Sequence, residues 1–151
     1  MITFSNTVEI ARSPTIVFAY LADLEHTPEW NWAIVSTRKV SPGRAGVGTR
    51  YEQTRSVPRP ATEVLEVTEL DSDRRIDIVG DLGPFKARLT YELSPIGGGT
   101  RLTNTVELEP RGPLGAVAGV FPGRIRSAVA ENLKVLKSLL QEERFAPVVN
   151  G

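Results

Sequence analysis

The sequence contains no cysteine and a single histidine, His26, among its 151 residues. Without cysteine the chain forms no disulfide, holds no thiolate-bound metal and has no cysteine nucleophile. One histidine cannot build a multi-histidine site, and no group of acidic residues has the spacing of metal ligands. We therefore expect no metal and no other cofactor. Because His26 precedes Thr27-Pro28 in an exposed connection, we expect it to be a surface residue with partners of its own.

The chain also lacks long apolar runs and an excess of either charge. Its 18 basic and 18 acidic residues balance, so no overall field attracts nucleic acid or an anionic membrane. No stretch approaches the roughly 20 apolar residues that cross a bilayer, and residues 1–10 lack the pattern of a signal peptide. We expect a cytoplasmic protein without a nucleic-acid partner and without stable membrane insertion.

What remains is a regular alternation that predicts one α+β domain. Residues 2–10 alternate apolar and polar side chains, the period of a strand with one buried face. Ser13-Pro14 and Thr27-Pro28 are each a helix cap followed by proline, so two short helices separate this strand from the rest. Turns rich in Gly and Pro then delimit six further strands, which pair as an antiparallel meander. The predicted ranges are 33–41, 47–57, 61–70, 74–80, 85–94 and 100–109.

The last quarter of the chain has a different period. Apolar residues recur there at helical spacing, opposite a polar face. They are Ile125, Val129, Leu133, Leu136 and Leu140. One long amphipathic helix therefore closes the fold and covers the sheet. We expect a single domain over residues 1–144 and a flexible tail over residues 145–151.

Several motifs along the chain belong together. They are Ser13 to Asp23, Glu29 to Trp32, Gly46 to Thr49, Glu66 to Leu70, Arg74 to Ile76, and Leu133-Lys134. The chain resembles, over nearly its whole length, the helix-grip superfamily of START-like lipid-transfer domains, plant pollen allergens and bacterial polyketide cyclase/dehydrase-like proteins. This resemblance implies a curved seven-stranded antiparallel sheet wrapped around the C-terminal helix, with an elongated apolar cavity between them. It implies no particular reaction, since the fold serves transport, sensing and catalysis.

Strand parity places one amide on an apolar face. Asn104 shares a face of strand 100–109 with Leu102, Val106 and Leu108. An unpaired amide there would cost about 1–3 kcal/mol, so Asn104 bonds to another protein group, to water or to a ligand.

The neighbouring strands supply further candidates by the same parity. Tyr91 shares a face with Phe85, and its hydroxyl either contacts a ligand or belongs to ordinary core packing. Tyr51 aligns with Gln53 and Arg55. If that face looks inward, Arg55 would orient a carboxylate or phenolate of the ligand; if it looks outward, it is a solvated strand.

The strand carboxylates carry a separate expectation. Glu63 and Glu69 fall on one face of strand 61–70, with Glu66 on the other. Carboxylates in such positions are usually solvated, so we assign them no catalytic role.

Two regions flank the expected cavity. Trp30 either completes the core or lines one end of the pocket. Segment 112–123, which includes Phe121, is apolar, rich in glycine and broken by prolines. It is either a gate, a loosely wound first turn of the last helix, or a surface for a partner or a membrane. The candidate ligand-binding residues are Trp30, Tyr51, Arg55, Phe85, Tyr91, Asn104, Phe121 and Val129.

The patterns that mark an enzyme are sparse. There is no Gly-x-Ser-x-Gly elbow, and Gly97 to Gly99 precede a strand rather than a helix, so they form a hairpin and not a phosphate cradle. The sequence favours binding or transport of a small hydrophobic molecule, a lipid or an aromatic polyketide-like compound. The alternatives are a polyketide cyclase, dehydratase or isomerase, and a partner- or membrane-binding module that uses segment 112–123. Whether a reaction is catalysed, and whether the protein is a homodimer, stays open.

Overall fold

The computed structural model describes residues 1–57, 59–111 and 122–142. Seven strands form one antiparallel sheet in the order β1-β7-β6-β5-β4-β3-β2. The strands are β1 Ile2–Ile10, β2 Ile34–Lys39, β3 Arg50–Arg55, β4 Ala61–Asp71, β5 Arg75–Leu82, β6 Phe85–Ile96 and β7 Gly99–Pro110. The helices are α1 Pro14–Ala22, the 3-10 helix η1 Leu24–His26, α2 Thr27–Trp30 and α3 Pro122–Gln141. The predicted helix-grip fold is confirmed.

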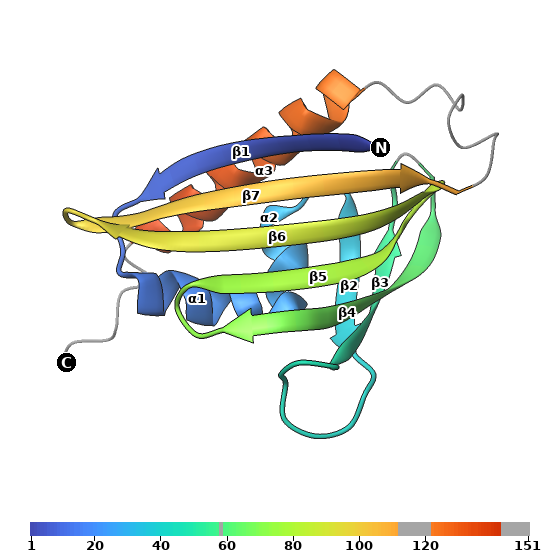
Figure 1. Ribbon diagram of the computed structural model, residues 1–151, viewed down its shortest axis with the longest axis horizontal. Coiled ribbons are helices and arrows are strands. Elements are labelled where there is room, and N and C mark those ends of the chain that lie inside the picture. Colours follow the sequence, from blue (N-terminus) through green and yellow to red (C-terminus); the bar gives the residue numbers. More distant parts are fainter. Residues whose placement is uncertain (58, 112–121, 143–151) are drawn as a thin grey trace.

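The sheet curves around the helices, which all lie on its concave side (Figure 1). Helix α3 packs along β1 and also contacts α2. Three hydrogen bonds tie α3 to the first strand and the residues after it. Asn6 Nδ2 donates to the Arg126 carbonyl (3.1 Å), the Ala11 amide donates to Gln141 Oε1 (2.7 Å), and Arg12 donates to the last turn of the helix. None of the helices in the described ranges is long and apolar enough to cross a membrane.

Capping residues determine where the short helices α1 and η1 begin. Ser13 Oγ accepts from the Ile16 amide, and Pro14 occupies the first helical position, where a missing amide hydrogen costs nothing. Asp23 then leaves the helical conformation, and its carboxylate accepts from the Glu25 amide to begin η1 (3.2 Å). Asp23 thus separates α1 from η1.

The predicted start of the third strand, residue 47, is three residues too early. Residues 46–49 form a turn in which Gly48 adopts φ +90°, a conformation that favours glycine. The Gly48 amide donates to the Val67 carbonyl (2.7 Å), and the Val67 amide donates to the Thr49 carbonyl (3.0 Å). The loop before β3 is therefore anchored on β4.

A β-bulge contradicts the prediction that Glu63 and Glu69 share a face. The register of β4 against β5 shifts between Val67 and Glu69, so that Glu69 lies opposite Asp77 on the outer side. One extra residue reverses the parity of everything that follows it in the strand. Glu63 consequently faces inward and Leu70 also faces inward.

The apolar core lies between the concave face and the helices. Leu133, Leu136 and Leu140 of α3 are buried in its main cluster, together with residues of α1, α2 and six strands. Full burial of a leucine side chain contributes about 1.5–3 kcal/mol, so these three residues add substantially to the packing of α3 on the sheet. A second, smaller cluster surrounds Phe85, with Ile125 from the start of α3 packed against it.

Candidate functional site

One row of cross-strand partners carries the polar groups of the concave face. The register pairs Asn6 with Asn104, Asn104 with Tyr91, Tyr91 with Ile76, and Ile76 with Leu70. We call these five residues the central row. Residues opposite one another in adjacent strands project on the same side. The row therefore combines two amides and a phenol with two aliphatic side chains.

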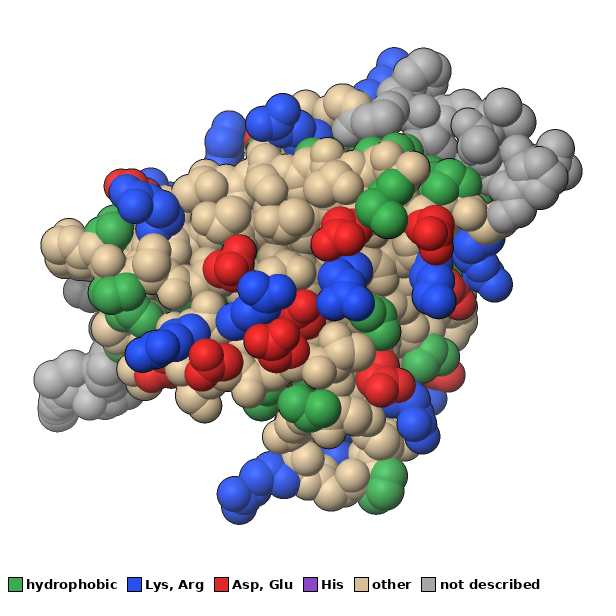
Figure 2. All heavy atoms as spheres, in the orientation of Figure 1, with side chains coloured by type: hydrophobic (Ala, Val, Ile, Leu, Met, Phe, Trp, Pro, Cys, Tyr) green, Lys and Arg blue, Asp and Glu red, His purple; other side chains and the backbone are tan. Residues whose placement is uncertain are grey.

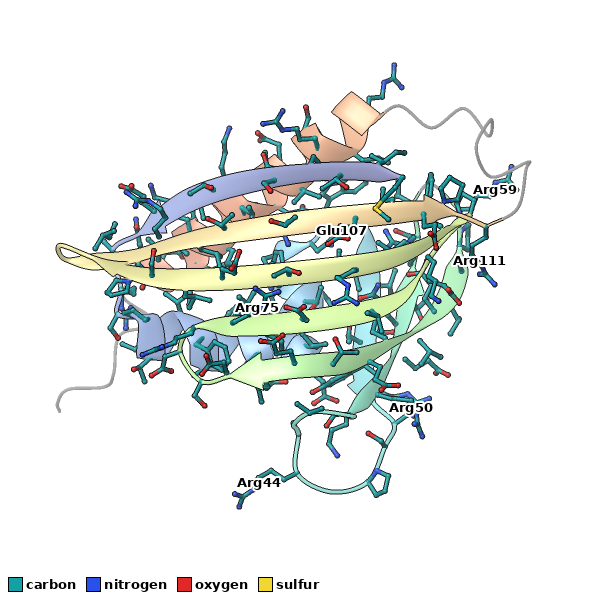
Figure 3. All side chains as sticks on the ribbon, viewed as in Figure 1. Arg44, Arg50, Arg59, Arg75, Glu107 and Arg111 are labelled. Atoms are coloured by element: carbon teal, nitrogen blue, oxygen red, sulfur yellow. The ribbon has the colours of Figure 1, made fainter. Side chains whose placement is uncertain are left out.

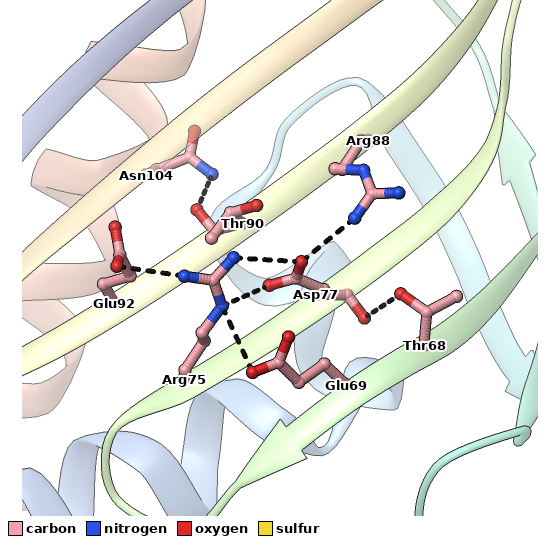
Figure 4. Close-up of polar contacts among 8 residues, drawn as sticks. All are labelled: Thr68, Glu69, Arg75, Asp77, Arg88, Thr90, Glu92 and Asn104. Atoms are coloured by element: carbon pink, nitrogen blue, oxygen red, sulfur yellow. Dashed lines mark hydrogen bonds and ion pairs between the residues drawn. The ribbon is translucent and has the colours of Figure 1, made fainter.

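Asn104 is buried, with 1% of its surface exposed. Its Nδ2 donates to the Thr90 carbonyl at 3.3 Å, across the β6–β7 pair (Figure 4). Its Oδ1 is buried and has no hydrogen-bond partner in the part of the chain that the structure describes. The amide predicted on an apolar wall is thus half satisfied by the protein.

Tyr91 is the second polar member of the row. Burial raises the pKa of its hydroxyl well above the ordinary value, so that Tyr91 is a neutral phenol at physiological pH. Its ring meets the Trp30 ring edge-on, with centroids 6.4 Å apart and planes at 88°. Trp30 and Tyr91, both predicted site residues, therefore lie in contact beneath α2.

Two further buried polar atoms lack a partner among the described residues. Asn132 Oδ1 belongs to α3, and Thr37 Oγ1 belongs to β2 at the edge of the sheet. Polar atoms buried in proteins are normally hydrogen-bonded, so these atoms pair either with ordered water or with a bound molecule.

Arg55 lies on an inward face, and its guanidinium is bound to Glu63. The Arg55 Nε lies 3.1 Å from both Glu63 oxygens. The same carboxylate accepts from Gln53 Nε2 (3.2 Å) and from the Gly83 amide (3.1 Å). The expectation that Glu63 is solvated is wrong, because these donors replace water around it. The charge that Arg55 would offer to a ligand is balanced within the protein.

A pocket of about 370 Å³ opens at the end of α1. The residues that line it come from α1 and the residue after it, η1, the β2–β3 connection and the four strands β2 to β5. They are Ala22, Asp23, Glu25, Lys39, Ala45, Gly46, Tyr51, Val67, Leu70 and Ile76. Tyr51, Val67 and Ile76 also belong to the main core cluster, and Leu70 packs against it. Part of the pocket wall is therefore formed by the apolar core.

The rim of this pocket is polar and held in place. The Glu25 carboxylate accepts from the Lys39 backbone amide at 2.9 Å, and Lys39 Nζ donates to the Ser41 carbonyl (2.8 Å) and to that of Gly43. Burial, followed by the negative charges of Asp23 and Glu25, raises the pKa of the Tyr51 hydroxyl. Tyr51 is thus a hydrogen-bond donor here. Arg44, in the same connection, points away from the sheet (Figure 3).

The other predicted site residues lie in several places. Val129 packs against the main core cluster, and Phe85 belongs to the second cluster. Of the predicted residues only Tyr51 is in the lining of the 370 Å³ pocket. Phe121 lies outside the described residues, as does segment 112–123 except for its last two positions, which begin α3.

His26 has partners, as expected of a surface histidine. Its ring stacks on Tyr20 with centroids 4.3 Å apart, and its two nitrogens lie 3.4 Å from Asp23 and 3.3 Å from Glu29. The Tyr20 hydroxyl donates to the same Glu29 carboxylate. In the described ranges no group of three or more His, Cys, Asp or Glu side chains is arranged to hold a metal ion.

Sequence reasoning missed a buried carboxylate on the convex face. Asp77, 1% exposed, is held by Arg75 (2.8 and 3.2 Å) and by Arg88 (3.2 Å) (Figure 4). The hydrogen bond to Asp77 raises the pKa of Arg75. The available signal was an acidic residue between Ile76 and Ile78 in an apolar strand. Around this cluster, charges of both signs intermingle over the face seen in Figure 2.

Comparison with solved structures shows the same fold in proteins of low sequence identity. A START superfamily protein from Mycobacterium smegmatis has a TM-score of 0.74 at 19% identity, covering 93% of this chain and 100% of that one. TTHA0849 from Thermus thermophilus has a TM-score of 0.73 at 23% identity, covering 90% and 94%. The di-domain ARO/CYC BexL from the BE-7585A biosynthetic pathway has a TM-score of 0.72 at 16% identity, covering 91% of this chain and 46% of that one.

Sequence comparison adds the family. No curated protein matches the chain. The model of one family, described as polyketide cyclase/dehydrase and lipid transport, matches residues 1–141, which include every strand and helix described above. The resemblance expected from the motifs is confirmed, and the chain belongs to the polyketide cyclase/dehydrase and lipid transport family.

Proposed function

We propose that this protein binds and carries a small hydrophobic molecule in the interior between the sheet and α3. The observation that carries the proposal is a 370 Å³ pocket whose wall includes Tyr51, Val67 and Ile76 of the main core cluster. The volume falls in the range of about 300–1,000 Å³ that is usual for small-molecule sites. Apolar walls with a few polar groups suit a ligand held mainly by buried area.

The first test is mass spectrometry of the purified protein, native and then denatured with organic extraction. We expect a stoichiometric apolar compound. The second test measures the fluorescence of N-phenyl-1-naphthylamine, a neutral apolar dye, on titration with the protein. We expect saturable binding at one site, and a linear, non-saturating signal would contradict the proposal.

A matched pair of variants locates the site. Leu70→Trp fills the pocket, because Leu70 is a half-buried lining residue on the inward face of β4. We expect at least tenfold weaker dye binding. Val64→Trp places the same side chain on the same strand, at an exposed position, and we expect no change. Equal binding by both variants would exclude this pocket as the site.

A second candidate is a cyclase, dehydratase or isomerase, which the family description and the likeness to BexL support at the level of the fold. The specific observation in its favour is that Tyr51 shares the pocket with Asp23 and Glu25. Its raised pKa makes the Tyr51 hydroxyl a proton donor rather than a base. Tyr51→Phe discriminates: a carrier keeps its affinity within a few-fold, whereas an enzyme that uses this proton loses about 100-fold or more in turnover.

A further inference from the structure

The Asn104 amide oxygen is an acceptor without a donor inside the described protein. The bond from Nδ2 to the Thr90 carbonyl determines which end of the amide is which, because a carbonyl oxygen only accepts. Oδ1 therefore points the other way, and it is buried without a partner. A buried acceptor of this kind accepts a hydrogen from ordered water or from a bound ligand.

The central row connects this acceptor with the pocket. Leu70 and Ile76 line the pocket, and Tyr91 and Asn104 are the next members of the row. Neighbouring strands lie about 4.8 Å apart, so Asn104 lies about 10 Å from Ile76 across the sheet. An elongated molecule with one end in the pocket would span this distance to reach Asn104, and the buried side chains of Ile76 and Tyr91 would have to move to admit it.

A second unpartnered acceptor belongs to the opposite wall. Asn132 is buried on α3, with its Oδ1 unpartnered among the described residues. Hydrogen bonds from Asn6 on β1 and from Ala11 just after it hold α3 at Arg126 and Gln141. Asn132 lies about 9 Å of helical rise beyond Arg126, between these two ties. Both walls of the interior thus present oxygen atoms that accept hydrogen bonds.

The charges of the interior are already compensated. Glu63 and Asp77 are the buried charged side chains in the described ranges. Glu63 is bound by Arg55, and Asp77 lies in the arginine cluster of the convex face. A carboxylate or phosphate carries only acceptors, so it would set oxygen against the oxygen of Asn104 and bury an unpaired charge. A protonated amine at the Asn104 end would also bury its charge, because Glu63 is already bound by Arg55 and the carboxylates of Asp23 and Glu25 lie at the pocket.

We propose that the ligand is an uncharged, elongated apolar molecule with a terminal hydroxyl, an alcohol or phenol, which donates to Asn104 Oδ1. This inference rests on the proposed function and specifies the class of ligand that the same interior takes. The proposal predicts that long-chain alcohols, sterol-like alcohols and phenols bind better than fatty acids of the same size. These compounds share an apolar body and differ in the polar end.

Three probes with one biphenyl body test it: 4-phenylphenol, 4-phenylbenzoate and 4-methylbiphenyl. Affinities are measured at pH 7 by displacement of N-phenyl-1-naphthylamine from the full chain. We expect the phenol to bind about two- to tenfold more tightly than the methyl compound, the factor that one net hydrogen bond makes. We expect it to bind at least tenfold more tightly than the carboxylate.

Asn104→Leu removes the acceptor and keeps the size of the side chain. The advantage of 4-phenylphenol over 4-methylbiphenyl should then fall to about one, while the methyl compound binds within about twofold of its original affinity. The control is Thr105→Val, at the next residue, whose hydroxyl is hydrogen-bonded to Ser5 Oγ on the convex side at 2.9 Å. It should leave all three affinities unchanged.

The outcomes separate the two proposals. If none of the three compounds binds, the proposed function fails and this inference with it. If all three bind equally, or if the carboxylate binds best, the proposed function stands and the inference is overturned. Should Asn104→Leu fail to fold, the order of the three affinities in the unmodified protein still decides between these outcomes.

Discussion

The two faces of the sheet differ in how completely their polar side chains are hydrogen-bonded. On the convex face the polar side chains pair with one another: Ser5 with Thr105 at 2.9 Å, and Asp77 with Arg75 and Arg88. Arg75 and Glu107 lie on this side, among charges of both signs (Figures 2 and 3). These side chains find their partners within the protein, so we interpret this cluster as structural.

On the concave face the polar groups are few and only partly paired. Glu63 is surrounded by donors, whereas Asn104 on the sheet and Asn132 on the opposing helix α3 each keep an unpartnered amide oxygen among the described residues. Leaving a buried acceptor unpaired lowers stability. From this contrast we infer that polar side chains paired within the protein serve the fold. Polar side chains left unpaired on an apolar wall indicate a ligand-binding site.

The largest loss of stability should come from a substitution on the concave side. Leu136→Ala removes a fully buried side chain of α3 from the main core cluster. We expect a loss of about 2–5 kcal/mol in the free energy of unfolding, measured with urea. Val64→Ala, on the exposed side of β4, should cost less than about 1 kcal/mol. Similar losses in both variants would show that the two faces contribute equally.

The convex cluster should matter for stability and leave ligand binding unchanged. Asp77→Ala leaves Arg75 and Arg88 close together without their shared carboxylate. Both arginines are partly exposed, which reduces the cost, so we expect about 2 kcal/mol of destabilisation in urea unfolding. Affinity for N-phenyl-1-naphthylamine should be unaltered. A loss of binding in the folded variant would mean that the convex face takes part in the site.

The pH dependence of the free energy of unfolding should reveal the buried phenol of Tyr91 on the concave face. The pKa of Tyr91 is raised by burial, so the folded state holds its proton more tightly than the unfolded chain does. The stabilisation is fully present below the unfolded pKa of about 10 and is lost as pH rises above it.

The Tyr91→Phe variant isolates this effect. Between pH 9 and pH 11 the unmodified protein should lose about 1.4 kcal/mol more stability than Tyr91→Phe. Urea unfolding at both pH values measures the difference. Equal losses in the two proteins would show that Tyr91 ionises as easily when folded as when unfolded.

Periodicity in the sequence was sufficient for the strands that run without interruption. In β6 and β7 it placed Tyr91 and Asn104 on the concave face, and pairing then brought them opposite each other. It failed in β4, because a bulge between Val67 and Glu69 depends on the partner strand and leaves no mark in local composition. Local sequence patterns also could not show that the Gly48 amide donates to the Val67 carbonyl.

Some predictions stay predictions. They are the cytoplasmic location, the oligomeric state, the role of segment 112–123 and of Phe121, and the separate tail at residues 145–151. The proposed ligand-binding roles of Trp30, Arg55, Phe85 and Val129 are of the same kind, since burial and packing are consistent with core positions as well.

The sequence by itself determined the fold class, the order of elements and the identity of the gripping helix, because alternation, capping and helical spacing are local properties of a chain. Only the tertiary structure decided which polar side chains are satisfied. Glu63 meets Arg55 from the neighbouring strand, and Asn104 meets a carbonyl on β6 with one end of its amide only. Hydrogen bonding depends on distance and direction between residues far apart in sequence, and these exist only once the sheet has curved around α3.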